Sequence, residues 1–259
     1  MFGKMLKKCS RNLACLLLSA TLSLFLAAGV LEAQAPSPAP TPPPIWSGDA
    51  SVSFVQTTGN SQNRSLGAGF NLVYQTAPWK VALRAAFIET KADDIETSRR
   101  FDTALRGERA FGERIAAYGQ VSYMRDLFAG IKGQEIGEAG GLYKFLTGPQ
   151  HLLSASAGLA YTKEQRVSPG RDLSFAGATT GISYRWKLSP TAEFAEDLNY
   201  LHDFKDSSDW RAGALTSLTA SVTKILSLKL SHQLSYLHVP VPGKKRTDTI
   251  LLASLVAKF

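Results

Sequence analysis

The chain has 259 residues, of which 44% are hydrophobic and 19% charged, with a formal net charge of +8 and a mean hydropathy of −0.05. Beyond the N-terminus it has no apolar run of about 20 residues, which excludes a bundle of membrane-spanning helices. Removing residues 1–35 lowers the net charge from +8 to +5, so charge alone does not indicate a nucleic-acid-binding protein.

Residues 1–35 are predicted to be a cleaved signal peptide. Basic residues lie between Lys4 and Arg11, an apolar stretch follows over residues 13–30, and Ala33-Gln34-Ala35 is a small-x-small cleavage candidate. Pro36 would follow that cut and hinder it, so cleavage anywhere from Gly29 to Ala35 stays open, as does an uncleaved anchor helix. Residues 36–44, PSPAPTPPP, are expected to form an extended periplasmic spacer.

From residue 45 to residue 259, apolar and polar side chains alternate in segments separated by turn residues, which predicts an all-β domain. The segments are long enough to cross a membrane as tilted strands of a barrel. We expect a transmembrane antiparallel β-barrel of about twelve strands, at residues 45–57, 64–75, 79–90, 98–110, 114–126, 132–146, 150–163, 171–187, 191–204, 209–223, 225–239 and 246–259.

The even number of strands places both termini on the periplasmic side. Short and long connections are expected to alternate along the chain, as in outer-membrane barrels. A soluble β-sandwich has no reason to keep such an alternation. The short turns are residues 76–78, 111–113, 147–149, 188–190 and the neighbourhood of Lys224; the longer loops are residues 57–63, 91–97, 127–131, 165–170, 205–208 and 240–245.

Aromatic residues at the two strand ends predict a belt at each membrane–water interface. Phe70 and Tyr200 fit this pattern less well. The first set lies near the short turns and comprises Trp46, Tyr74, Trp79, Phe111, Tyr143, Trp186, Phe194 and Phe259; the second lies near the long loops and comprises Phe54, Phe87, Phe101, Tyr123, Tyr161, Phe204, Trp210 and Tyr236.

The last strand alternates up to a terminal Phe259, which is how outer-membrane barrels usually end, and we interpret this residue as an assembly signal. Trp46-Ser47-Gly48, then Thr58-Gly59-Asn60, then Trp79 at the start of an alternating strand resemble an uncharacterised family of putative salt-induced outer-membrane proteins. The resemblance implies a Gram-negative outer-membrane barrel without an assigned reaction. One departure is that Ala257 and Ser254 stand where such barrels usually carry a bulky residue and a glycine.

Charged residues on the polar faces of the strands are expected to line the lumen. They would either pair into a salt-bridged filling or border a channel, and a cationic wall would favour anions. The candidates are Lys80, Arg84, Arg100, Asp102, Arg106, Glu108, Glu138, Arg185, Lys187, Asp197 and Lys229. We therefore expect a small passive pore or an envelope-integrity protein under osmotic stress, or else a purely structural plugged barrel.

An outer-membrane hydrolase of lipid or peptide is the alternative from another functional class. Ser231-His232, with Ser235 and His238 nearby, suggest lipid hydrolysis. Asp93-Asp94 and His202-Asp203, which lie at long-loop ends, suggest peptide hydrolysis. Neighbouring residues on a strand point to opposite faces, however, so they cannot bond as a nucleophile and its base must. We therefore expect no enzyme.

The basic residues Lys244, Lys245 and Arg246 could contact the phosphates of lipopolysaccharide, or simply be solvated. Other expected partners are outer-membrane lipid, the barrel assembly machinery and periplasmic chaperones. Both cysteines, Cys9 and Cys15, lie in the signal peptide, and no phosphate-binding loop or metal-ligand spacing occurs. We expect no cofactor, no metal site and no nucleic-acid partner.

Overall fold

A computed structural model describes residues 45–57, 63–167 and 169–259 of the chain. The chain separates into two units, residues 1–42 and 43–259, and the fold described below is that of the second unit. The signal peptide, the proline-rich spacer and Thr58-Gly59-Asn60 lie outside the described residues. No helix in the described ranges is long and apolar enough to cross a membrane.

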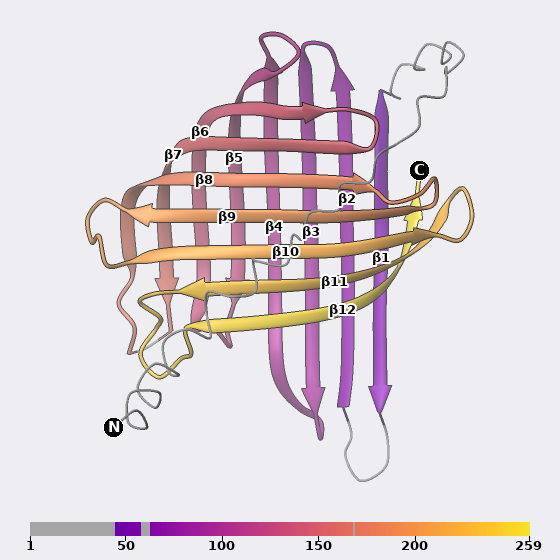
Figure 1. The fold of residues 1–259 in the computed structure, drawn as a ribbon. Helices are drawn as coiled ribbons and strands as arrows, with labels where there is room; N and C mark the ends of the chain where they lie inside the picture. The colour runs from indigo at the N-terminus through magenta and orange to yellow at the C-terminus, as the bar shows by residue number, and fades with distance from the viewer. Residues whose placement is uncertain (1–44, 58–62, 168) are drawn as a thin grey trace, which may run out of the picture. The chain divides into compact units, whose positions relative to one another are not determined.

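The described residues form twelve antiparallel strands that close into a barrel, which confirms the predicted fold class (Figure 1). Each strand pairs with its neighbours in sequence, and β1 pairs with β12. The strands are β1 (Trp46–Thr57), β2 (Asn63–Thr76), β3 (Trp79–Ala92), β4 (Ile95–Ala110), β5 (Ile115–Asp126), β6 (Ile131–Thr147), β7 (His151–Arg166), β8 (Leu173–Lys187), β9 (Ala192–Asp203), β10 (Trp210–Ser221), β11 (Leu226–Leu237) and β12 (Thr247–Lys258).

The connection between β3 and β4 differs from its prediction. In place of a polar loop over residues 91–97, the strands extend to Ala92 and from Ile95, and a turn of Asp93 and Asp94 joins them. Both aspartates have positive φ, 49° and 60°. Aspartate tolerates the left-handed conformation better than most residues, so it can form the tight turn that matches the twist of a hairpin. The sequence suggested a loop because its polar residues continue into the strands.

The seam between β1 and β12 is much shorter than the other strand pairings. Their register runs only from Asp49 opposite Lys258 to Val52 opposite Leu255. The backbones of Gly48 and Phe259 add two reciprocal hydrogen bonds of 3.0 and 3.1 Å. β1 pairs with β2 along its whole length, from Trp46 to Thr57. Figure 1 shows β12 bending toward β1 only near its C-terminal end.

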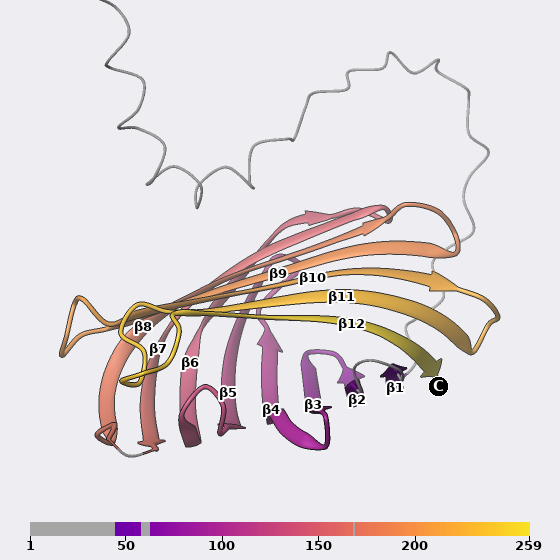
Figure 2. The same cartoon turned by 90° about the horizontal axis from the view of Figure 1, so that it is seen from below.

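Within the barrel, β1–β5 form one wall and β8–β12 the opposite wall, and the strands of the two walls run in crossing directions (Figures 1 and 2). A hydrophobic cluster of Ala160, Phe175 and Leu201, with Ile136 and Leu173 against it, packs on the inside of β6–β9. The rest of the interior is largely polar, so the barrel has no continuous apolar core.

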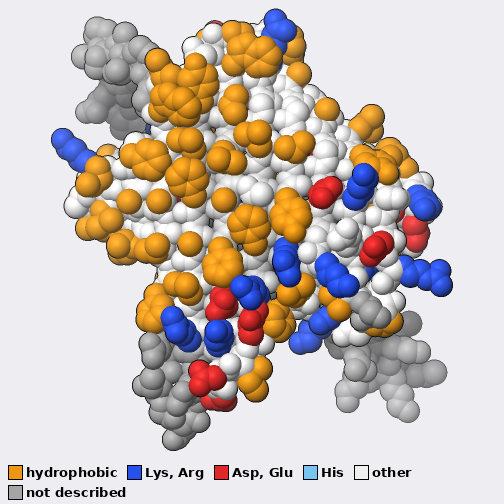
Figure 3. All heavy atoms as spheres, turned by 180° about the vertical axis from the view of Figure 1, so that it is seen from behind, with side chains coloured by type: hydrophobic (Ala, Val, Ile, Leu, Met, Phe, Trp, Pro, Cys, Tyr) orange, Lys and Arg blue, Asp and Glu red, His pale blue; other side chains and the backbone are white. Residues whose placement is uncertain are grey.

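The outside of the barrel is apolar. Large hydrophobic side chains such as Leu83, Leu105, Val121 and Leu159 are exposed on β3, β4, β5 and β7, and Figure 3 shows a hydrophobic band on the face formed by the first strands. Aromatic rings meet at both ends of this band. The ring centroids of Trp46 and Tyr74 are 4.7 Å apart at the short-turn end, and those of Trp210 and Tyr236 are 4.8 Å apart at the other end.

Candidate functional site

Contacts between strands that are not neighbours identify the inner face of the barrel. Thr179 on β8 donates a hydrogen bond of 2.8 Å to Glu138 on β6, and Arg211 on β10 contacts Glu164 on β7 at 2.5 Å. Such bonds can form only across the interior. Since side chains alternate along a strand and register partners share a face, these contacts fix the inward and outward positions of all twelve strands. All the predicted lumen residues occupy inward positions.

A row of ion pairs lies on the inner face of β3 and β4. Arg106 Nε lies 2.7 Å from Glu108, and Lys80 Nζ lies 4.0 Å from the same carboxylate. Asp102 lies 3.3 Å from Arg100 and 3.9 Å from Arg84. The predicted cations of this wall therefore face carboxylates of the same wall, and they form a band of mixed charge.

This row of polar contacts continues from β4 to β8 through Tyr118 on β5. The Arg106 guanidinium lies 3.8 Å from the centre of the Tyr118 ring, and the Tyr118 hydroxyl donates a short hydrogen bond to Glu138. On β7 the Tyr118 hydroxyl faces Gly158. A Cβ at Gly158 would lie 2.7 Å from the Tyr118 hydroxyl oxygen and 2.6 Å from a backbone oxygen. Glycine at this position is therefore what allows Tyr118, Glu138 and Thr179 to meet.

Two predicted lumen residues near the short-turn end also pair with each other, because Arg185 Nη2 lies 2.8 Å from Asp197. Lys187 stands opposite Glu193 in the register of β8 and β9, and Lys229 stands between Thr219 and Ser254. Neither lysine forms an ion pair within the described part of the chain. Lys80 and all four predicted lumen arginines thus form ion pairs, whereas Lys187 and Lys229 form none among the described residues.

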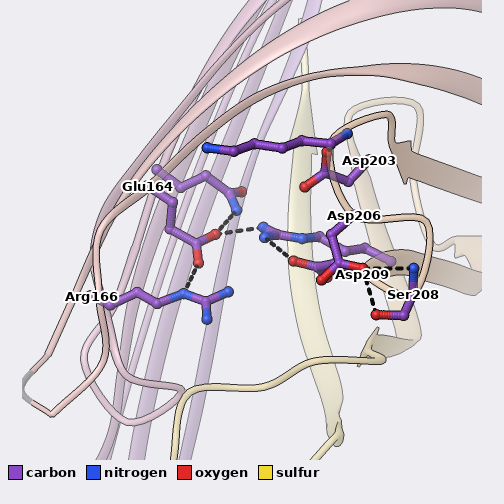
Figure 4. Close-up of polar contacts among 9 residues, drawn as sticks. Glu164, Arg166, Asp203, Asp206, Ser208 and Asp209 are labelled. Atoms are coloured by element: carbon purple, nitrogen blue, oxygen red, sulfur yellow. Dashed lines mark hydrogen bonds and ion pairs between the residues drawn. The ribbon is translucent and has the colours of Figure 1, made fainter.

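A buried network lies at the long-loop end of the interior (Figure 4). Glu164 accepts hydrogen bonds from Arg166 at 2.6 Å, Arg211 at 2.5 Å and Gln134 at 2.5 Å, and Asp209 lies 3.6 Å from Arg211. The Glu164 side chain is only 1% exposed. Sequence reasoning did not select Glu164, Arg166 or Asp209, because charges beside a loop look solvated. For Glu164 and Arg166, inward parity in β7 was the signal available; Asp209 lies in the loop before β10 and had none.

Loop residues add two carboxyl groups beside this network. Burial raises the pKa of the Asp209 carboxyl, as does the neighbouring Glu164 charge, whereas Arg211 and Arg166 lower it. The exposed Asp206 shows the opposite shift, since hydrogen bonds from the hydroxyl and backbone amide of Ser208 lower its pKa. Figure 4 shows Asp209 beside the network and Asp206 next to Ser208.

The loop between β11 and β12 also covers this end of the barrel. Its Val241 is 2% exposed, and the positions nearest to it include Gly130 and Gly170 of two other loops. The predicted basic patch of Lys244, Lys245 and Arg246 follows directly and is exposed. One loop therefore carries both an anchor that is buried among its neighbours and a basic tip that faces solvent.

Phe259 lies at the seam. Besides its backbone bonds to Gly48, its ring stacks on Phe70 with centroids 6.4 Å apart. A Cβ at Gly48 would lie 2.6 Å from this ring, so glycine makes room for the terminal aromatic side chain. Phe70, which fitted the aromatic pattern poorly, thus has a role as the partner of Phe259.

The residues considered for hydrolysis separate across the barrel wall. His202 and His232 take outward positions, while Asp203 and Ser231 take inward ones. His202 lies beside Phe204, with ring centroids 6.3 Å apart. In residues 45–57, 63–167 and 169–259, no group of three His, Cys, Asp or Glu side chains is placed to hold a metal ion.

A closed antiparallel barrel with an apolar exterior and a charged interior defines the class: this is the fold of outer-membrane β-barrels. Residues 50–259 match the family described as "Protein of unknown function, DUF481", and the chain belongs to that family. It is 20% identical over 211 residues to the uncharacterized protein YdiY of Escherichia coli K12, covering 80% of this chain and 81% of that protein.

Solved structures show the same fold at low identity. The COG4313 outer membrane channel from Pseudomonas putida F1 has a TM-score of 0.53 and 11% identity, covering 88% of this chain and 100% of its own. The NanC porin has a TM-score of 0.51 and 6% identity, covering 82% of this chain and 98% of its own. At such identity the likeness establishes the arrangement of strands.

Proposed function

We propose that this protein is a small passive pore of the Gram-negative outer membrane, exported with a signal peptide that is then cleaved. The observation that carries the proposal is the environment of Arg84. This side chain points into the barrel near mid-strand, yet it is 57% exposed. An inward side chain that remains exposed borders water-accessible space, which a tightly packed interior would not contain.

The opposite wall supports the same function through its chemistry. The inward positions of β10 and β11 carry hydroxyl and amide groups, among them Ser217, Thr219, Ser231, Gln233 and Ser235. Such groups can exchange hydrogen bonds with water and small polar solutes. A hydrophilic wall that faces a charged wall suits the passage of small hydrophilic solutes.

Arg84 and Lys80 should give the pore a modest preference for anions, because they are the more exposed members of their ion pairs. Planar-bilayer recording on refolded protein should show discrete currents with an anion-favouring reversal potential in a KCl gradient. Arg84→Gln should shift the anion-to-cation permeability ratio by roughly twofold toward cations.

The matched control is Arg109→Gln on the outward face of β4, where the guanidinium lies 5.4 Å from the Trp79 ring centre. It removes the same charge without touching the lumen and should leave selectivity unchanged. Absence of current above background would contradict the pore, and unaltered selectivity in Arg84→Gln would contradict the anion preference.

A plugged barrel is the second candidate, and the buried network around Glu164 favours it. Arg166, Arg211, Gln134 and Asp209 converge there beneath the long loops, where they narrow the route to the outside. In the same recordings a plugged barrel would be silent as wild type and would conduct once Glu164→Ala breaks the network. A pore would conduct in both forms.

We also propose that the protein supports the envelope under osmotic stress, on the resemblance to putative salt-induced proteins alone. Protein abundance should then rise after a step increase in NaCl, and a constant level would argue against this role. We propose no catalytic role, because His202 and His232 face away from their acidic and hydroxyl neighbours. Lipid or peptide turnover that is lost on changing either histidine would contradict this proposal.

Membrane insertion is proposed to use the barrel assembly machinery after delivery by periplasmic chaperones. Phe259 supports this proposal, since its backbone bonds to Gly48 and its ring stacks on Phe70 at the seam between β1 and β12. Deleting Phe259 should lower the amount of membrane-inserted protein, whereas Lys258→Gln beside it should not.

A further inference from the structure

Charged side chains gather on the outside of the barrel at the long-loop end of β2–β7. Figure 3 shows basic and acidic side chains together beyond the hydrophobic band. We call the outward members of this group the outer charged belt, and they are Arg64, Glu89, Lys91, Arg99, Arg125, Glu135 and Lys163.

Charged residues of the belt are register partners across three strand pairs, β2–β3, β3–β4 and β6–β7. Arg64 stands opposite Lys91, Glu89 stands opposite Arg99, and Glu135 stands opposite Lys163. Register partners on one face of a sheet have Cβ atoms about 5 Å apart, so charges on adjacent strands are close neighbours.

The depth of the belt follows from the aromatic residues beside it. Arg125 is opposite Phe101, whose ring centroid is 6.3 Å from that of Tyr123, and Tyr123 is opposite Glu135. Aromatic rings of this kind lie where headgroups begin. Because a strand rises about 3.3 Å per residue, Arg125 and Lys163 lie within roughly 7 Å of that level. They are at headgroup depth rather than far out in solvent.

Several cations of the belt have no carboxylate partner. Lys91 lies 3.2 Å from Glu89 and Arg99 lies 3.7 Å from Glu96. Arg125 and Lys163, in contrast, form no ion pair among the residues that the structure describes. Arg64 makes a cation–π contact, 5.9 Å from the Phe54 ring centre, and no ion pair with any described residue. Arg64, Arg125 and Lys163 are exposed on the outer face of the barrel, so these belt cations are open to an external anion, unlike the unpaired lysines that face the lumen.

The belt covers one side of the barrel only. At the same end of β8–β12, the described outward positions carry aromatic, small or neutral polar side chains, such as Tyr200, Trp210, Tyr236 and Thr249. The charged side chains at this level are therefore confined to the wall formed by β2–β7.

We propose that the outer charged belt binds the phosphate groups of phosphorylated lipids in the outer leaflet. This inference rests on the proposed outer-membrane function. Guanidinium and ammonium groups at headgroup depth match phosphate in charge and in hydrogen-bond geometry, and arginine can bind it through two parallel bonds. The surface lies on the barrel wall, apart from the basic loop tip of residues 244–246.

The test compares the wild type with Arg125→Gln/Lys163→Gln in zwitterionic micelles, after a gel-shift check that each barrel has formed. The control, Arg114→Gln/Lys224→Gln, removes the same charge from short turns at the opposite end of the barrel. The probes are a diphosphorylated glucosamine lipid, its dephosphorylated form and phosphatidylglycerol, and the readout is the lipid-dependent rise in Tm.

We expect the diphosphorylated lipid to raise the Tm of the wild type and control, and to bind the belt variant at least about fivefold more weakly. If phosphatidylglycerol raises the Tm less than the diphosphorylated lipid does, the belt prefers phosphate monoesters. If the two rises are equal, the belt also binds the phosphates of phospholipids. Equal binding to the belt variant, or a full effect of the dephosphorylated lipid, would overturn the proposal. A barrel that conducts ions but ignores phosphate would contradict this inference alone, and one that binds phosphate but is silent would contradict the pore alone.

Discussion

At the scale of single residues, the charged groups of this barrel are of two kinds, buried in a hydrogen-bonded network or exposed in a solvent-screened ion pair. Glu164 is bonded by two arginines and a glutamine and is almost fully buried. Removing the Glu164 carboxylate would leave the buried Arg166 charge uncompensated, at a cost of about 3–5 kcal/mol. Arg84, more than half exposed and 3.9 Å from Asp102, contributes little to stability because water screens the pair. The first kind holds the long-loop end together, and the second leaves charge available to solutes.

Asp209 should make the stability of this end depend on pH. Its folded-state pKa is raised by burial, so the folded protein binds the proton more tightly and loses stability as pH rises through that pKa. Asp209→Asn should therefore raise the unfolding free energy by about 1 kcal/mol near pH 8 and by much less at acidic pH. Thermal unfolding in detergent over this pH range measures the difference.

Asp206→Asn in the same loop is the matched control. The Asp206 pKa is lowered by its bonds to Ser208, so this substitution should give no gain at pH 8. A uniform effect of Asp209→Asn at all pH values would show that its charge is not the cause.

At the scale of strands, alternation predicted the elements well because the membrane and the lumen impose opposite solvents on successive side chains. Strand ends were less predictable. Polar residues such as Lys91 and Thr97 read as a loop but continue β3 and β4, since beyond the membrane a strand can be polar on both faces. The short β1–β12 seam could not be predicted, because register between the first and last strands depends on the closure of the whole sheet.

The seam predicts which cysteine pairs can cross-link. Ser51 and Val256 are partners in the register, in a position between hydrogen-bonded pairs where Cα atoms lie about 4.5 Å apart. In a chain that also carries Cys9→Ser and Cys15→Ser, Ser51→Cys/Val256→Cys should form a disulfide under mild oxidation.

Val55→Cys/Leu252→Cys continues the same register by four residues, beyond the point where the pairing ends. It should remain reduced under the same conditions, as judged by a maleimide gel-shift assay. Efficient cross-linking of this second pair would contradict the short seam.

At the scale of the whole molecule, the fold and much of the list of lumen residues could be predicted from the sequence. The ion-pair partners of those residues could not. Lys80, Arg84 and Arg106 were predicted to line the lumen from parity alone, and they occupy inward positions. Whether these residues form a cationic wall depends on ion pairs such as that of Arg106 with Glu108. The network at Glu164 likewise depends on contacts between β6, β7 and β10. Such contacts depend on how the barrel closes and on how its two walls cross. The alternation pattern of each single strand holds no information about either.

The central claim is that these strands form a closed barrel in the outer membrane, and gel mobility after membrane fractionation tests it most directly. The chain should sediment with the outer membrane, and without boiling it should migrate faster than the boiled sample, because a closed barrel resists unfolding by detergent. A chain found in the soluble periplasmic fraction, with the same mobility before and after boiling, would contradict the account.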